Sequence, residues 1–231
     1  MATKRTYEDG CAAAHGLDLI GERWALLVVR ELCLGPKRFT DLRAGLPGIS
    51  PNVLTERLDE LERVAVVQRR KLPLPAGSWV YELTDWGREL EPLIMALGRW
   101  AARSPVLPMG NPMSINSLIL SFRTMFDSVA SAGFDTAIDL VLGEERFHAR
   151  IAAGRMQLER GGARAPDAII EADPNTLAGV VYGEVKLSDA LRSGDLKVEG
   201  DKSAVKRFVT LFPLPERAAP AARTTPGNKR G

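Results

Sequence analysis

Few side chains in this sequence could act as nucleophiles, bases or metal ligands. The chain holds two cysteines, Cys11 and Cys33, and two histidines, His15 and His148. Two histidines are too few for a histidine-based metal cluster, and His148 alternates with Phe147 along a predicted strand, so we expect it to face solvent. The sequence contains no P-loop, GxSxG, HExxH or paired CxxC motif. It therefore predicts no enzyme active site, no metal site and no cofactor.

The chemistry that the sequence does favour is contact with phosphate. Between Lys37 and Lys71 eight basic residues stand against five acidic ones, although the formal net charge of the whole chain is only +2. Lys37 and Arg38 precede a predicted short helix, and Arg69, Arg70 and Lys71 lie at the base of a predicted hairpin. Lysine and arginine at such positions hold a nucleic-acid backbone without reading its sequence.

Two helices joined by a tight turn are predicted around Pro47-Gly48. The first is FTDLRAGL, for which Thr40 is the expected N-cap. Ser50 caps the second, and Pro51 takes its first position. The second helix carries one apolar stripe at i, i+4 and i+7: Leu54, Leu58 and Leu61. This is the helix-turn-helix pattern.

A hairpin and a long apolar helix follow. VVQRRK and WVYEL are predicted strands around the Pro/Gly tip LPLPAG, which places a wing directly after the second helix. Thr84 caps the next helix. Its apolar stripe is long for the end of a small domain and indicates a partner helix from a second subunit. The expected dimerisation residues are Leu90, Leu93, Ile94, Leu97 and Trp100.

Three blocks together resemble the HxlR-type winged helix-turn-helix regulators, relatives of the MarR group. They are CAAAHGLDLIGERWALLVVRELCLGPKRFTDLR, LPGISPNVLTERLDELE and YELTDWGRELEPL, within residues 7–103. The resemblance implies a homodimer that binds palindromic operator DNA, with the helix from Ser50 in the major groove. Two positions depart from the family pattern. Ala65 stands where a glycine commonly ends this helix, which disfavours a left-handed cap there, and Ala12 replaces a proline.

From this resemblance and the charges we predict the DNA contacts. Asn52, Val53, Thr55 and Glu56 are expected nearest the base edges, and Ser50 with the helix N-terminus is expected to meet a phosphate. The full predicted set is Lys37, Arg38, Ser50, Asn52, Val53, Thr55, Glu56, Arg57, Arg69, Arg70 and Lys71.

Cys11 matches the N-terminal cysteine that oxidants or electrophiles modify in some HxlR-type proteins. The resemblance therefore makes Cys11 a candidate redox residue, with an inert residue at the start of a helix as the alternative. The neighbouring charges Glu8, Asp9 and His15 give its thiol no clear push toward the reactive thiolate. Cys33 ends an apolar helix and is expected to be a small core residue.

A proline-rich linker, residues 104–113, separates the winged domain (1–103) from a predicted α+β domain (114–215). The last residues, 216–231, are expected to form a disordered tail. The run DAIIEADPNTLAGVV…SDALRSGDLKVEGDKSAVKRFVTLF resembles the sterol-carrier-protein type 2-like fold. That resemblance implies an apolar tunnel, for which we predict a pocket lined by Phe122, Met125, Phe126, Leu140, Phe147, Met156, Ile170, Val205, Phe208 and Phe212. The alternative is that these side chains simply fill a core.

The predicted fold class is α+β: a winged helix-turn-helix domain and a sterol-carrier-like α/β domain. The predicted function is transcription regulation by a homodimer on double-stranded operator DNA, modulated by a small apolar effector. One alternative is a carrier of apolar ligands whose winged domain serves dimerisation; an acyl- or acetyl-transferase partner is weaker, because no nucleophile or cofactor loop is visible. No apolar run nears the roughly 18 residues of a membrane span. With its polar N-terminus and two cysteines, the chain is expected to be cytoplasmic.

Overall fold

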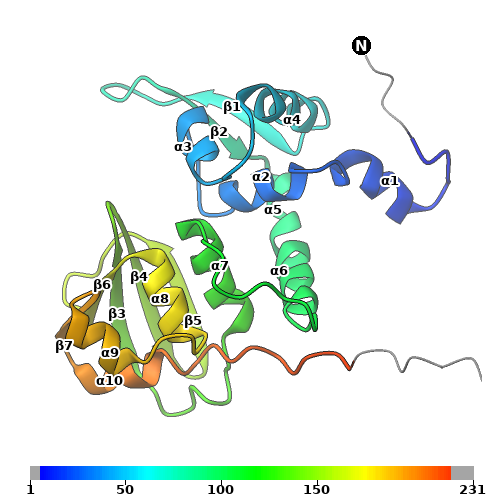
Figure 1. Cartoon of the computed structure of the whole chain (residues 1–231). Helices are drawn as coiled ribbons and strands as arrows, with labels where there is room; N and C mark the ends of the chain where they lie inside the picture. The colour runs from blue at the N-terminus through cyan, green and yellow to red at the C-terminus, as the bar shows by residue number, and fades with distance from the viewer. Residues whose placement is uncertain (1–5, 220–231) are drawn as a thin grey trace, which may run out of the picture.

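The N-terminal part of the chain folds into a helical domain with a two-stranded wing (Figure 1). The computed structural model describes residues 6–219. The elements of this domain are α1 (Ala12–Ile20), α2 (Ala25–Leu32), α3 (Phe39–Ala44), α4 (Pro51–Arg63), β1 (Val67–Lys71), β2 (Trp79–Leu83), α5 (Asp85–Arg88) and α6 (Leu90–Ala101). The predicted helix-turn-helix is α3 and α4, and the predicted wing is the antiparallel pair β1–β2.

Local sequence signals set most of these boundaries. The Ser50 side chain accepts a hydrogen bond from the Val53 N–H at 3.3 Å, and Pro51 opens α4, as predicted. Thr84 caps α5 by accepting from the Gly87 N–H at 2.9 Å. The prediction for α3 was wrong by two residues: its N-cap is Arg38, because the Asp41 carboxylate accepts the Arg38 N–H at 3.3 Å and leaves Thr40 inside the first turn.

The end of α4 uses an alanine in a left-handed conformation. Ala65 has φ +57°, its N–H donates to the Glu62 carbonyl at 3.0 Å, and the Val66 N–H donates to the Leu61 carbonyl at 2.9 Å. These two bonds form the Schellman motif that glycine usually terminates. The expectation that alanine would disfavour this cap was wrong, because Val66 and Leu61 are both buried and hold the chain in place.

The C-terminal part is a five-stranded sheet covered by helices. Its elements are α7 (Ile115–Met125), β3 (Thr136–Leu142), β4 (Glu145–Ala152), β5 (Arg155–Arg160), β6 (Ala168–Ala172), α8 (Pro174–Val181), α9 (Leu187–Ser193), β7 (Leu196–Gly200) and α10 (Lys202–Phe208). The strand order is β5-β4-β3-β6-β7, with β3 and β6 parallel and the other neighbours antiparallel. Ile138, Leu140 and Phe147 lie on the sheet face that packs against the helices.

Helices α6 and α7 lie side by side at the junction of the two domains (Figure 1). Residues 104–113 connect them without helix or strand. The chain returns to this junction near its end, where the Ala218 N–H donates to the Arg103 carbonyl at 2.7 Å. Of the tail expected to be disordered, residues 220–231 lie outside the described residues. No helix in the described part has the length and apolar character needed to cross a membrane.

A buried carboxylate joins the domains. The Glu31 side chain on α2 is fully buried and accepts from Lys37 Nζ at 2.8 Å, Arg30 Nη2 at 2.9 Å and Ser114 Oγ at 2.6 Å. The Glu31 backbone carbonyl accepts from Asn116 Nδ2 at 2.6 Å. Ser114 also caps α7. We call these five residues the Glu31 cluster. It connects α2, the segment before α3, and the start of the C-terminal domain.

Replacing Glu31 with glutamine keeps the shape of the side chain and removes its charge. We expect Glu31→Gln to lower the free energy of unfolding by about 3 kcal/mol, because Lys37 and Arg30 then lose their carboxylate in a largely desolvated site. Urea denaturation measures this. The matched control, Glu199→Gln at an exposed position, is expected to stay within about 0.5 kcal/mol of the parent. Equal stabilities for the two variants would contradict the role given to the cluster.

Ala65→Gly tests the strained cap. We expect the free energy of unfolding to rise by about 1 kcal/mol, because the left-handed conformation costs an L-residue roughly that much and costs glycine nothing steric. The same change at Ala44, the exposed last residue of α3, should instead lose a few tenths of a kcal/mol. A loss of stability at both positions would argue against strain at Ala65.

Candidate nucleic-acid interface

Helix α4 lies on the side of the winged domain away from the C-terminal sheet (Figure 1) and carries a polar face. Ser50, Asn52, Thr55 and Glu56 are all exposed, and Val53 is half-buried at the edge of this face. The opposite face of the helix buries the predicted apolar stripe. The capped N-terminus of α4 is also exposed, so its backbone N–H groups can meet an anion. This face has the groups needed to contact base edges and one phosphate.

Arg57, one of the predicted DNA contacts, is largely buried. Its side chain is only 9% exposed and pairs with Glu60, with Glu56 Oε2 3.6 Å away. Arg57 falls three residues after Leu54 and four before Leu61, on the core side of α4. Its guanidinium group is therefore paired with glutamates of the same helix.

Lys37, another of the predicted DNA contacts, is also engaged within the protein. Its ammonium group bonds Glu31 at 2.8 Å and its side chain is 12% exposed. Its backbone pairs with Tyr81 in a short bridge that extends the wing. Lys37 therefore neutralises a buried carboxylate, and Arg38 next to it keeps its place at the exposed N-cap of α3.

The wing holds one arginine on an aromatic platform. Arg69 lies over two rings, with its guanidinium carbon 4.7 Å from the centre of the Trp79 ring and 5.9 Å from that of Tyr81. The pairing of Arg69 with Tyr81 and of Lys71 with Trp79 places all four on one face of the hairpin. The rings restrict the motion of Arg69, and the Arg69 side chain is itself exposed.

Arg70 lies on the other face and is already paired. It makes two hydrogen bonds to Glu82, from Nε to Oε1 and from Nη2 to Oε2, both at 2.8 Å. These bonds hold the pKa of the Glu82 carboxyl below its usual range. The triplet predicted to act together is thus divided by strand alternation: Arg69 and Lys71 are available to a phosphate and Arg70 is engaged.

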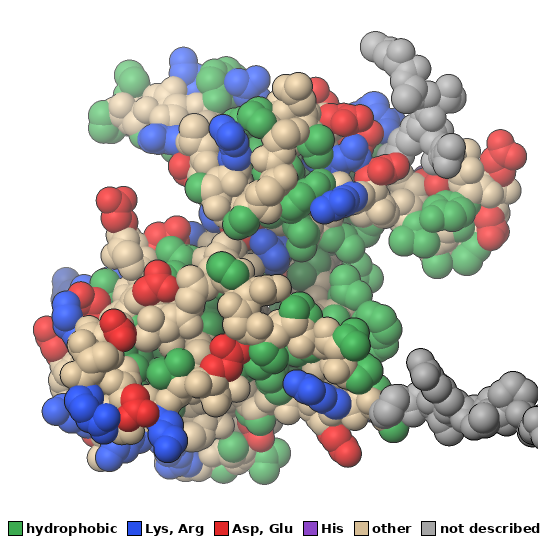
Figure 2. Space-filling model, viewed as in Figure 1, with side chains coloured by type: hydrophobic (Ala, Val, Ile, Leu, Met, Phe, Trp, Pro, Cys, Tyr) green, Lys and Arg blue, Asp and Glu red, His purple; other side chains and the backbone are tan. Residues whose placement is uncertain are grey.

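Basic side chains gather along the top of the winged domain in Figure 2. Two exposed side chains on this surface were absent from the set of predicted DNA contacts. Arg43 is exposed on α3, and Trp79 supports Arg69. The signal for Trp79 was present in the alternation of WVYEL.

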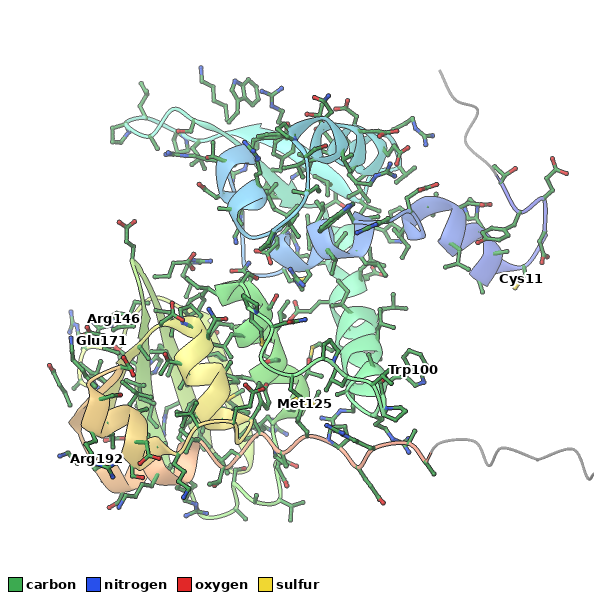
Figure 3. All side chains as sticks on the ribbon, in the orientation of Figure 1. Cys11, Trp100, Met125, Arg146, Glu171 and Arg192 are labelled. Atoms are coloured by element: carbon green, nitrogen blue, oxygen red, sulfur yellow. The ribbon has the colours of Figure 1, made fainter. Side chains whose placement is uncertain are left out.

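The predicted dimerisation stripe is divided between two environments. Leu90 and Ile94 are half-buried against the core of the winged domain. Leu93, Leu97 and Trp100 are 50%, 46% and 73% exposed. Figure 3 shows Trp100 on the side of α6 that faces away from the C-terminal domain. The apolar surface available to a partner is therefore the outer part of the stripe, and Leu90 and Ile94 belong to the core of this subunit.

The two cysteines differ in environment. Cys11 is exposed at the outer end of α1 (Figure 3), where hydrogen bonding from the backbone N–H groups of Ala14 and Ala13 lowers the pKa of its thiol. Burial raises the pKa of the Cys33 thiol to about 12, and its Sγ donates to the Val29 carbonyl at 3.3 Å. The backbone supplies the push toward thiolate that the neighbouring charges lack.

The apolar pocket predicted inside the C-terminal domain is filled. The Phe122 and Phe212 rings stack with centres 4.5 Å apart, and Phe208 meets Phe212 edge-on at 5.1 Å. Leu140, Phe147, Ile170 and Val205 are likewise buried in this core. Of the ten predicted pocket residues, Phe126 and Met156 line a shallow site beside β5, and Met125 lines cavities at the domain junction. Bulky side chains pack against one another here and leave no tunnel among the described residues.

His148 does not simply face solvent. Its Nδ1 lies 2.8 Å from Oδ1 of Asp139, a fully buried carboxylate that also accepts from Arg146 Nε at 2.9 Å and from the Ala163 N–H at 3.2 Å. These bonds hold the loop after β5 against the sheet. Within residues 6–219 no group of three His, Cys, Asp or Glu side chains is arranged to bind a metal ion.

Two family models match the chain, one for each domain. HxlR-like helix-turn-helix matches residues 19–105, and alkyl sulfatase C-terminal matches residues 109–218. The second match differs from the sterol-carrier resemblance, which stays a prediction. A solved sec-alkylsulfatase, Pisa1 from Pseudomonas sp., aligns with 42% of this chain and 15% of its own, at 17% identity and a TM-score of 0.38.

Curated relatives match the winged domain. The uncharacterized HTH-type transcriptional regulator YvaP of Bacillus subtilis is 40% identical over 85 residues, which are 37% of this chain and 79% of YvaP. YodB of the same organism, also an HTH-type transcriptional regulator, is 39% identical over 83 residues, 36% of this chain and 74% of YodB. The solved reduced form of YodB aligns with 43% of this chain and 99% of its own, at 33% identity and a TM-score of 0.38. The chain belongs to the HxlR-like helix-turn-helix family.

Proposed function

We propose that this protein is a sequence-specific transcriptional regulator that binds a palindromic operator as a homodimer. The observation that carries the proposal is the pairing of an exposed polar face on α4 with an arginine held on the aromatic wing. The family membership and the regulator relatives support it.

The two parts of this surface have different tasks. Asn52, Thr55 and Glu56 enter the major groove, where an asparagine can bond adenine and a glutamate can accept from cytosine. Arg69 and Lys71 contact the backbone beside the groove and fix the register of α4. Ser50 and the N-terminus of α4 hold a further phosphate.

Surfaces that one subunit leaves uncovered support the proposed homodimer. No residue of α1 is buried against the described part of the chain, although α1 reads AAAHGLDLI. Figure 2 shows hydrophobic side chains over the outer side of α6. A second copy would cover both surfaces and place two copies of α4 about 34 Å apart, one helical turn of DNA.

The C-terminal domain is proposed to be sterol-carrier-like and to make operator binding responsive to a small apolar molecule. The second candidate function is an apolar-ligand carrier that uses the winged domain for dimerisation. An apolar cavity at the domain junction favours a ligand in either case.

Arg69→Ala and Arg70→Ala form a matched pair on the wing. We expect Arg69→Ala to weaken binding to an operator selected from random DNA and to flatten the slope of log K against log salt by about 0.9, the loss of one phosphate contact. Arg70→Ala should change the slope much less, because Glu82 already holds that side chain. Asn52→Ala should instead alter the sequence preference. Titrations at several salt concentrations measure all three; wild-type behaviour of Arg69→Ala and Asn52→Ala together would refute this interface.

Cys11 is proposed to be the residue through which oxidants or electrophiles release the operator. YodB has been solved bound to a quinone and after diamide treatment. We expect a maleimide to label Cys11 with a pH midpoint below that of free cysteine and to leave Cys33 unmodified in the folded protein. Diamide should lower the operator affinity of the parent and of Cys33→Ser but not of Cys11→Ser. If Cys11→Ser stays diamide-sensitive, the assignment is wrong.

A further inference from the structure

We propose that the cavity between the domains binds an uncharged or cationic apolar molecule, and that its occupancy alters the operator affinity. This deepens the proposed function, on which its second half rests. The site is different from the tunnel expected inside the C-terminal domain.

Small residues create this cavity. It has a volume of about 340 Å³, near the lower end of the roughly 300–1,000 Å³ typical of small-molecule sites. Gly98 and Ala101 of α6 line one side, and Ala178 and Gly179 of α8 line another. Figure 3 labels Met125, another lining residue, at the end of α7 beside α6. These side chains are too short to fill the space between the helices.

The polar groups at the wall select the charge of the ligand. Tyr182 donates to Ser121 Oγ at 2.5 Å, and burial raises the pKa of its phenol to about 12, so it stays neutral. Glu184 is the one charged side chain among the described lining residues, and neither lysine nor arginine is among them. An anionic ligand would lie beside a carboxylate with no cation to balance it. A neutral or amine-bearing apolar molecule meets no such cost.

The linker forms the outer wall and is held at two points. The Gly110 N–H donates to Glu184 Oε1 at 2.9 Å, and the Met113 N–H donates to Asn175 Oδ1 at 2.8 Å. Both acceptors belong to the C-terminal domain. Release of these two bonds would uncover the cavity without disturbing either core, which gives a ligand a way in.

The cavity adjoins the parts of the winged domain that bind DNA and a partner. A second cavity of about 470 Å³ shares Gly98, Ser121 and Met125 with it and extends to the turn at residues 45–47, just before α4. The outer side of α6 carries the exposed Trp100. A molecule between α6 and α8 therefore touches the helix proposed to form the dimer and lies next to the turn that positions α4.

Two fluorescent probes with one skeleton test the ligand class. N-phenyl-1-naphthylamine is neutral, and 8-anilino-1-naphthalenesulfonate adds a sulfonate. We expect saturable binding of the neutral probe to the full-length protein, with the sulfonate at least about tenfold weaker, a difference of about 1.4 kcal/mol. Equal affinities, or no saturable binding of the neutral probe, would overturn the site.

Variants place the probe in this cavity. Ala178→Phe should abolish binding of the neutral probe by filling the space, and Ala101→Phe should do so from the α6 side if Ala178→Phe fails to fold. Glu184→Gln keeps the acceptor for Gly110 and should reduce the preference against the sulfonate to about threefold or less; Glu199→Gln, on the exposed surface, should leave it unchanged. Unaltered binding in folded Ala178→Phe or Ala101→Phe would place the probe elsewhere and refute the proposal.

Operator titrations test the coupling separately. Saturating N-phenyl-1-naphthylamine should shift the affinity for the selected operator by about fivefold or more in the parent protein and not in Ala178→Phe. An unshifted operator affinity with the probe bound would refute the coupling while leaving the ligand site. Failure to select any operator would refute the proposed function, and the probe experiment, which needs no DNA, would still decide the site.

Discussion

A carboxylate that water cannot reach must be surrounded by donors, and the donors for Glu31 come from three separate segments of the chain. These hydrogen bonds constrain the residues that surround Glu31. A Cβ on Gly45 would lie 2.4 Å from Glu31 Oε2, so the residue after α3 has no room for a side chain. The ammonium group of Lys37 bonds Glu31 and does not extend to the exposed surface of the winged domain. Ser114, at the start of α7, bonds the same carboxylate and so contacts the winged domain. The buried charge of Glu31 thus helps to fix the position of the C-terminal domain relative to the helix-turn-helix, together with the packing of α6 on α7 and the Arg123–Glu91 ion pair.

Sequence reasoning succeeded where a structural choice depends on neighbours along the chain. Ser50 and Thr84 were each predicted to begin a helix, and each caps one. It failed where partners meet only after folding. Neither the pairing of Lys37 with Glu31 nor the burial of Arg57 could be read from the basic run that contains them. A glutamate within the apolar stretch LLVVREL was a visible anomaly, but its partner Ser114 lies in another domain.

The cavity was misplaced for a related reason. The predicted pocket was built from large apolar residues, and such residues attract one another and close-pack, as the stacked rings of Phe122 and Phe212 do. Space remains where rigid backbones meet through residues too small to fill it, here Gly98, Ala178 and Gly179. Glycine and alanine in facing helices, with a proline-rich segment across them, were the more informative pattern.

Helix α1 has a consequence for the chemistry of Cys11. It is nine residues long and has no fully buried residue, and only its C-terminal end, at Ile20, packs against the core of its own subunit; isolated helices shorter than about 12–15 residues are marginal in water. The backbone N–H groups that lower the pKa of the Cys11 thiol belong to Ala13 and Ala14 in the first turn of α1, so this effect requires that α1 be helical. In the proposed dimer, the partner subunit supplies the contacts that keep it so. Under that proposal, thiol reactivity would be a property of the assembly, and oxidant sensitivity would rise with the protein's own concentration.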